Sequence, residues 1–167
     1  MSDEGRALVV LIGAPGAGKT RTAKRIARLL NAPLVDTDKR IVAEHGPIAT
    51  IFAEHGEPHF RALERAAVAQ ALTERAVVSV GGGAVLHPDT QAELADHRVV
   101  QLTVSRDAFA DRIGTGKRPL VTSLDAWSAL VDARQPVYDR LSQLTIDTSR
   151  QPLEGVAEQI VEWLESE

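Results

Sequence analysis

The residues that could do chemistry begin at one glycine-rich octapeptide. Gly13-Ala14-Pro15-Gly16-Ala17-Gly18-Lys19-Thr20 follows an apolar run and precedes an amphipathic segment. Glycines let the backbone curl so that successive N–H groups converge on an anion at the positive end of the following helix. Lys19 would neutralise the β- and γ-oxygens of a triphosphate, and the Thr20 hydroxyl would hold a bridging Mg²⁺. The pattern predicts a binding site for a nucleoside triphosphate.

Two aspartates follow the second apolar run, in Val35-Asp36-Thr37-Asp38. Many phosphate-loop enzymes place a magnesium-binding aspartate at the end of a later strand, but Val77-Val78-Ser79-Val80 offers no carboxylate there. Asp36 is therefore the candidate for the waters of the metal. Asp38 would point to the same side if the strand continued, and it could take the proton of an attacking hydroxyl. The alternative is that these aspartates cap the next helix.

A run of three glycines, Gly81-Gly82-Gly83, follows the third apolar run. Glycines allow a ligand to approach the backbone closely, and their N–H groups can form an anion-binding nest. The alternative is a plain tight turn, for which one or two glycines would suffice. The run is interpreted as a ligand-binding segment.

Arg61 and Glu64 lie three residues apart in Phe60-Arg61-Ala62-Leu63-Glu64, on one face of a predicted helix. Such pairs are usually solvated and contribute little to stability, and this segment alone favours that interpretation. The functional alternative is that Glu64 orients the Arg61 guanidinium for bidentate binding of a carboxylate.

A basic segment with two glycines runs through Arg112-Ile113-Gly114-Thr115-Gly116-Lys117-Arg118-Pro119-Leu120. A cationic flexible loop near a nucleotide site can close over the transferring phosphate and supply charge to the transition state. Arg118 is the best candidate for that role, with Arg112 and Lys117 as auxiliaries. A solvated connector is the alternative.

The order of apolar segments indicates a single α/β domain over residues 1–167, with a mobile lid at about 111–121. Strands alternate with helices, which favours parallel βαβ units that bind ligands beyond the carboxyl ends of the strands. Trp127 and Trp163 are interpreted as core residues rather than stacking platforms. The predicted strands are 7–12, 33–36, 76–80, 98–104 and 144–147, and the predicted helices include 19–30, 58–75 and 153–165.

Composition narrows the class of protein. The 19 basic and 23 acidic residues give a net charge of −4, so nothing supports a nucleic-acid partner. There is no cysteine, which excludes disulfides and thiolate-bound metals. No apolar run approaches the length of a membrane span, and the acidic start Met1-Ser2-Asp3-Glu4-Gly5 does not look like a secretory signal. We expect a cytoplasmic protein without a membrane partner, and a monomer.

Taken together, these motifs resemble the shikimate kinase family from about residue 8 to residue 160. The phosphate loop, Asp-x-Asp, Phe-Arg-x-x-Glu, Gly-Gly-Gly and Arg-Pro-Leu occur in the order and at the spacing of that family. The resemblance implies a three-layer fold of the nucleoside-monophosphate-kinase type, with five parallel strands ordered 2-3-1-4-5. It also implies a Mg²⁺-dependent kinase that transfers the γ-phosphate of ATP to the 3-hydroxyl of shikimate. The products would be ADP and shikimate 3-phosphate, in chorismate and aromatic amino acid biosynthesis.

The resemblance also assigns roles to individual residues. Asp38 matches the family's candidate base, which binds the hydroxyls of shikimate, and Asp36 matches the residue near Mg²⁺. Arg134 opens Arg134-Gln135-Pro136-Val137-Tyr138, which looks like the family's helical R-x-x-x-Y segment, and Arg150 would stack on adenine. The implied catalytic residues are Lys19, Asp38 and Arg118, and the implied metal-binding residues are Thr20 and Asp36. The implied acceptor-binding residues are Asp38, Arg61, Gly81, Gly82, Gly83 and Arg134. The implied nucleotide-binding residues are the phosphate loop with Arg112, Arg118 and Arg150.

Two other functions stay open from the sequence. A gluconate kinase would also bind a hydroxylated carboxylic acid, although the combination of Phe-Arg-x-x-Glu, the triple glycine and Arg-Pro-Leu argues against it. A nucleotide-binding regulatory module that has lost its activity is the second alternative. Lys19, Asp38 and Arg118 argue against that alternative, because such a module would not need all three.

Overall fold

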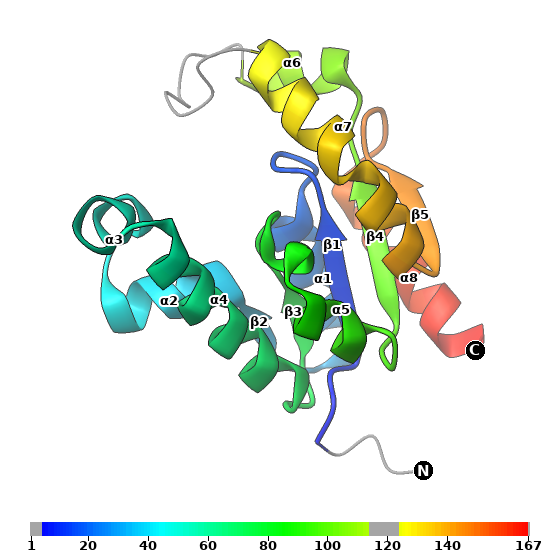
Figure 1. Cartoon of the computed structure of the whole chain (residues 1–167). Helices are drawn as coiled ribbons and strands as arrows, with labels where there is room; N and C mark the ends of the chain where they lie inside the picture. The colour runs from blue at the N-terminus through cyan, green and yellow to red at the C-terminus, as the bar shows by residue number, and fades with distance from the viewer. Residues whose placement is uncertain (1–4, 114–123, 167) are drawn as a thin grey trace.

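A computed structural model describes residues 5–113 and 124–166. Its centre is a parallel sheet with the strand order β2-β3-β1-β4-β5 (Figure 1), which confirms the predicted fold class and order. The observed strands lie within or close to the predicted ranges. They are β1 (Val9–Gly13), β2 (Leu34–Asp36), β3 (Val77–Ser79), β4 (Val99–Thr103) and β5 (Leu144–Asp147).

Helices cover both faces of this sheet, so the domain has three layers (Figure 1). Side chains alternate along β1, and Val9 and Leu11 join the core with α1 and α8, whereas Val10 and Ile12 join the opposite core with α4. The helical elements are α1 (Lys19–Leu30), α2 (Thr37–His45), α3 (Ile48–His55), α4 (Glu57–Leu72), the 3₁₀ turn η1 (Ala84–Leu86), α5 (Pro88–Leu94), α6 (Arg106–Ile113), α7 (Leu124–Leu141) and α8 (Leu153–Ser166).

Helices α2, α3 and α4 form a group beside β2 with a small core of their own (Figure 1). Ile41, Ile51 and Phe60 fill that core, and the Phe52 ring packs 4.9 Å from the Phe60 ring, measured between centroids. None of the helices in the described ranges combines the length and the hydrophobicity that crossing a bilayer requires.

The carboxyl ends of β1, β2 and β3 bring the predicted motifs together at one edge of the sheet. The phosphate loop follows β1, the two aspartates follow β2 and the triple glycine follows β3. The predicted strand end at residue 36 is confirmed, and Asp36 caps the next helix as the alternative interpretation states. The strand geometry does not continue to Asp38, because Asp36 caps α2 and Asp38 already lies in the first turn of that helix.

The end of β1 depends on the absence of a side chain at Gly13. Its φ is +138°, and a β-carbon there would overlap the carbonyl oxygen of Leu102 on β4. Two neighbouring backbones can therefore approach each other closely where the phosphate loop begins.

We predict that Gly13→Ala destabilises the protein by more than about 4 kcal/mol or prevents folding, because strain and steric overlap add. The matched control is Gly46→Ala, whose φ of +89° is strained but whose β-carbon would meet no atom within 4 Å. We expect that control to cost about 1–3 kcal/mol. Urea denaturation of both variants measures the difference, and equal losses would contradict the overlap at Leu102.

Candidate active site

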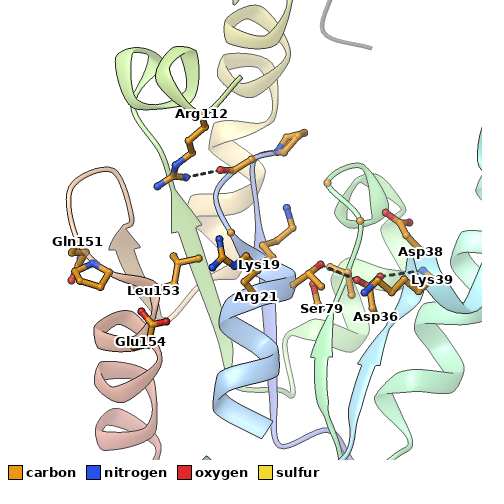
Figure 2. A pocket seen from close by; sticks show the side chains of 18 residues that line it. Lys19, Arg21, Asp36, Asp38, Lys39, Ser79, Arg112, Gln151, Leu153 and Glu154 are labelled. Atoms are coloured by element: carbon orange, nitrogen blue, oxygen red, sulfur yellow. Dashed lines mark hydrogen bonds between the residues drawn. The ribbon is translucent and has the colours of Figure 1, made fainter. Parts of the chain in front are cut away.

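A cavity of about 900 Å³ opens at the carboxyl ends of the central strands. Figure 2 shows Asp36 and Asp38 on one side of it, Arg112 and Gln151 on the other, and Lys19 between them. The walls come from the phosphate loop and the start of α1, the start of α2, residues 79–82 after β3, and residues 151–154 at the start of α8. With Arg112 of α6, the cavity therefore joins five segments that are far apart in the sequence.

The phosphate loop wraps one end of the cavity and leads directly into α1. Gly16 and Gly18 have φ values of +86° and +90°, which only glycine adopts without strain. The Lys19 ammonium donates hydrogen bonds to the carbonyl oxygens of Gly13 (2.7 Å) and Ala14 (3.0 Å). Burial lowers the pKa of Lys19 to about 8, although the charge of Asp38 acts in the opposite direction. The lysine is therefore protonated at neutral pH, and its ammonium group binds two carbonyl oxygens of the loop.

Thr20 and Asp36 make direct contact at the wall of the cavity. The Thr20 hydroxyl donates to Oδ2 of Asp36 at 2.8 Å, while Oδ1 of Asp36 accepts from the backbone N–H of Lys39 and caps α2. The helix-cap interpretation of Asp36 is confirmed, and the metal-binding interpretation stays a prediction that the contact with Thr20 supports. Hydroxyl and carboxylate oxygens are the ligands that Mg²⁺ prefers, and Mg²⁺ usually keeps several waters and phosphate oxygens besides. The pair therefore fits a magnesium ion beside a triphosphate.

Asp38 reaches the cavity from the first turn of α2 rather than from a strand. Its carboxylate lies against the backbone of Gly81, where a β-carbon would be 2.7 Å from Oδ1. Burial and the neighbouring charge of Asp36 raise the pKa of Asp38, while Lys19 and Arg61 partly offset that rise. A carboxylate with these properties suits proton transfer better than an exposed aspartate does.

The triple glycine makes room for three charged side chains, one at each residue. Asp38 lies against Gly81, Nη1 of Arg134 is 3.0 Å from where a β-carbon of Gly82 would stand, and Nη1 of Arg61 is 2.6 Å from the equivalent point at Gly83. None of the three glycines has φ in the left-handed region. The segment forms the tight turn of the alternative interpretation, closed by a hydrogen bond from the Ala84 N–H to the Gly81 carbonyl oxygen, and its glycines allow the three side chains to approach closely. The anion-binding nest stays a prediction.

Arg61 and Glu64 are not the solvated pair that their segment favours. Their side chains form an ion pair at 2.8 Å, and Glu64 is only 4% exposed. Burial raises the pKa of Glu64, and the hydrogen bond from Arg61 acts against that rise. A buried carboxylate that needs its partner fixes the guanidinium next to Gly83, as the functional alternative requires.

Helix α7 supplies the third charged side chain, Arg134, and also a residue to which the sequence assigned no role. The Tyr138 hydroxyl donates to the carbonyl oxygen of Gly82 at 2.7 Å, and Tyr138 is 1% exposed. The buried Nε of Arg134 has no hydrogen-bond partner among the described residues. Tyr138 could have been found from its spacing, since Arg134 and Tyr138 lie one helical turn apart and face the same loop.

Arg150, which was predicted to stack on adenine, lies outside the lining of the cavity, and its predicted role is not tested by this position. That residue is exposed and does not line the cavity, whereas Gln151, Pro152 and Leu153 of the same segment do. Arg112 lines the cavity from α6 and donates to the carbonyl oxygens of Gly16 and Thr148, at 2.6 Å each. The predicted roles of Arg118 and Lys117, and most of the predicted lid, lie outside the described residues.

Comparison with known proteins decides between the families that such a site allows. The model of the family described as "Shikimate kinase" matches residues 15–165. A shikimate kinase of Thermobifida fusca is 44% identical over 164 residues, which cover 95% of each chain. The chain belongs to the shikimate kinase family. A solved shikimate kinase from Acinetobacter baumannii, in complex with shikimate, has a TM-score of 0.88 and 28% identity, with 98% of this chain and 96% of that one covered.

Gluconate kinase was the enzyme alternative that the sequence left open, and the comparison with a gluconokinase shows a common fold only. A gluconokinase from Sinorhizobium meliloti superposes with a TM-score of 0.63 at 17% identity, over 98% of this chain and 94% of the other. At that identity the likeness extends to the fold alone.

We predict that Gly83→Ala raises the KM for shikimate about 10- to 100-fold, because the new β-carbon displaces a guanidinium that makes charge-assisted hydrogen bonds. The backbone φ at Gly83 is ordinary, so any fall in the melting temperature should come from the disturbed ion pair between Arg61 and the buried Glu64. Gly155→Ala is the control, since its β-carbon meets no atom within 4 Å. An unchanged KM for Gly83→Ala would show that Arg61 does not need this space.

Proposed function

We propose that the protein transfers the γ-phosphate of ATP to the 3-hydroxyl of shikimate, forming ADP and shikimate 3-phosphate for aromatic biosynthesis. One observation carries the proposal. Asp38, Arg134 and Arg61 converge on three consecutive glycines beside the phosphate loop, and Asp38, Gly81 and Gly82 line the cavity while the two arginines lie behind that lining. This arrangement supports an acceptor site next to the triphosphate site. Family membership supplies the identity of the acceptor.

The charges of the acceptor site suit a hydroxylated carboxylic acid. Arg61 and Arg134 provide planar donor pairs that match a carboxylate, and Glu64 holds Arg61 in place. Asp38 provides an acceptor for a hydroxyl proton on the side of the cavity nearest Lys19, close enough that each group shifts the pKa of the other. The carboxylate of shikimate therefore binds the arginines while its ring hydroxyls face Asp38.

In the proposed reaction Asp38 accepts the proton of the 3-hydroxyl as the oxygen attacks the γ-phosphorus. A new O–P bond forms, the bond from the γ-phosphorus to the β–γ bridging oxygen breaks, and ADP leaves with that electron pair. Lys19 exchanges its hydrogen bonds to loop carbonyls for bonds to phosphate oxygens. Positioning and electrostatics provide most of the acceleration in such a transfer.

Several finer assignments belong to the same proposal. Thr20 and Asp36 would hold Mg²⁺, which neutralises developing charge on the phosphates when it is bound. Arg112 and Pro152 would flank the adenine, and Arg118 would act from the lid. We further propose a monomeric, single-domain, cytoplasmic enzyme that has no nucleic-acid or membrane partner.

The experiment that tests the function measures ADP release from ATP and Mg²⁺ with shikimate, with gluconate and without an acceptor. We expect turnover that depends on shikimate. Release with gluconate alone would assign the protein to the other kinase class. ATP binding without turnover on either acceptor would favour the regulatory module instead.

We predict that Asp38→Asn lowers kcat at least about 100-fold, because general-base catalysis contributes on the order of 10²–10⁴ to such rates. The amide keeps the shape of the side chain, so the Kd for ATP should stay within about twofold. Steady-state kinetics and calorimetry measure the two quantities, and Lys39→Gln, next in sequence at the rim of the cavity, controls for local charge. Full activity of Asp38→Asn would exclude Asp38 as the base.

A further inference from the structure

Trp127 of α7 contacts the phosphate loop through a polar atom. Its indole Nε1 donates a hydrogen bond to the carbonyl oxygen of Pro15 at 2.9 Å, and the side chain is 5% exposed. The indole also stacks on the Phe109 ring of α6, with centroids 4.1 Å apart and an interplanar angle of 7°. Two helices that flank the predicted lid in sequence therefore meet at the outer side of the loop.

The hydrogen bond to Pro15 fixes the orientation of one peptide unit of the loop. In a trans peptide the C=O and the following N–H point in opposite directions. Because the Pro15 carbonyl points to Trp127, the Gly16 N–H points away from α7. Gly16 lines the cavity, and its N–H makes no hydrogen bond within the described part of the chain. An unpaired backbone N–H at this position is available to donate a hydrogen bond to a phosphate oxygen.

Two further contacts hold the same turn from outside. The Phe109 ring fills the space where a β-carbon of Gly16 would stand, and Arg112 binds the Gly16 carbonyl oxygen. Phe109 itself is fully buried and is held in place by the stacked indole. Neither aromatic residue lines the cavity, so the pair supports the backbone of the loop from outside it.

The acceptor side of α7 has an anchor of its own. Tyr138 lies eleven residues after Trp127, on the same face of the helix, and holds the Gly82 carbonyl. Loss of the Trp127 hydrogen bond should leave that contact in place. A defect at Trp127 is therefore expected on the nucleotide side only.

We propose that Trp127 is a positioning residue for the nucleotide, which sets the Gly16 N–H toward the phosphates by binding the Pro15 carbonyl. This role is more specific than filling the core, the function to which the sequence assigns both tryptophans. The inference rests on the proposed nucleotide site and does not depend on the identity of the acceptor.

The test compares Trp127→Phe, which keeps a stacking ring and loses the N–H, with Trp163→Phe. Trp163 packs at the edge of the core from α8 and, among the described residues, has no hydrogen bond or ring contact with the loop, so it is a matched control. We expect the Kd for ADP, from calorimetry well below the melting temperature, to rise about 3- to 10-fold in Trp127→Phe only. The KM for shikimate should stay within about twofold in both variants, since Tyr138 still holds Gly82.

A spectroscopic measurement uses the fact that the chain has two tryptophans. In Trp163→Phe all indole emission comes from Trp127, and in Trp127→Phe it comes from Trp163. We expect ADP to change the emission of the first variant, with the Kd found by calorimetry, and not that of the second. The arm that uses Trp163→Phe keeps Trp127 intact, so it holds even if Trp127→Phe folds poorly.

The outcomes separate this inference from the proposed function. If the unmodified protein does not bind ADP, the proposed nucleotide site fails. If it binds ADP and Trp127→Phe has the same Kd, Trp127 is a core residue and the inference is overturned. An equal rise in the Kd for ADP and the KM for shikimate would also overturn it, because a general disturbance of α7 would then be the cause. Emission from Trp127 that does not respond to ADP would have the same consequence.

Discussion

The site depends on the absence of three β-carbons after β3. Gly81, Gly82 and Gly83 leave space that is filled by Asp38 from α2, Arg134 from α7 and Arg61 from α4. Each helix approaches from a different direction, and a single side chain on this segment would push one charged group away. Because the glycines have ordinary backbone angles, their value lies in the approach they allow and not in their flexibility.

Mutual compensation allows so many charged groups to share one buried region. Burial acts against the charged forms of Lys19, Asp38 and Glu64, and in each case a neighbouring opposite charge acts the other way. Asp38 opposes the effect on Lys19, Lys19 and Arg61 oppose that on Asp38, and Arg61 opposes that on Glu64. Removal of one member would leave another buried charge uncompensated, so the set is expected to respond to substitution as a unit.

The sequence predicts most of the fold because the apolar runs are continuous and the strands are buried on both faces. Helix α1 was predicted with its observed bounds because its stripe of apolar residues is regular, and in the structure Asn31 ends it in a left-handed conformation. The sequence predicts that β2 stops at residue 36, as observed, but it leaves open whether Asp36 binds a metal or caps the next helix. Asp36 satisfies a strand, a helix cap and a bond to Thr20 together, and only the three-dimensional arrangement shows that Asp38 belongs to a helix.

The sequence also could not show which other residues contact each residue of the site. The pair Arg61 and Glu64 has the spacing of a surface pair, and its importance comes from the burial of Glu64 beneath other elements. Arg150 has the type of residue expected beside adenine, yet the chain turns so that its neighbours Gln151 and Pro152 line the cavity. Trp127 is buried as its hydrophobicity predicts, but its one polar atom finds a carbonyl of the phosphate loop. The types of residue in the sequence limit which chemistry a site can perform. The hydrogen bonds that the polar atoms of buried side chains make determine where in the fold those residues act.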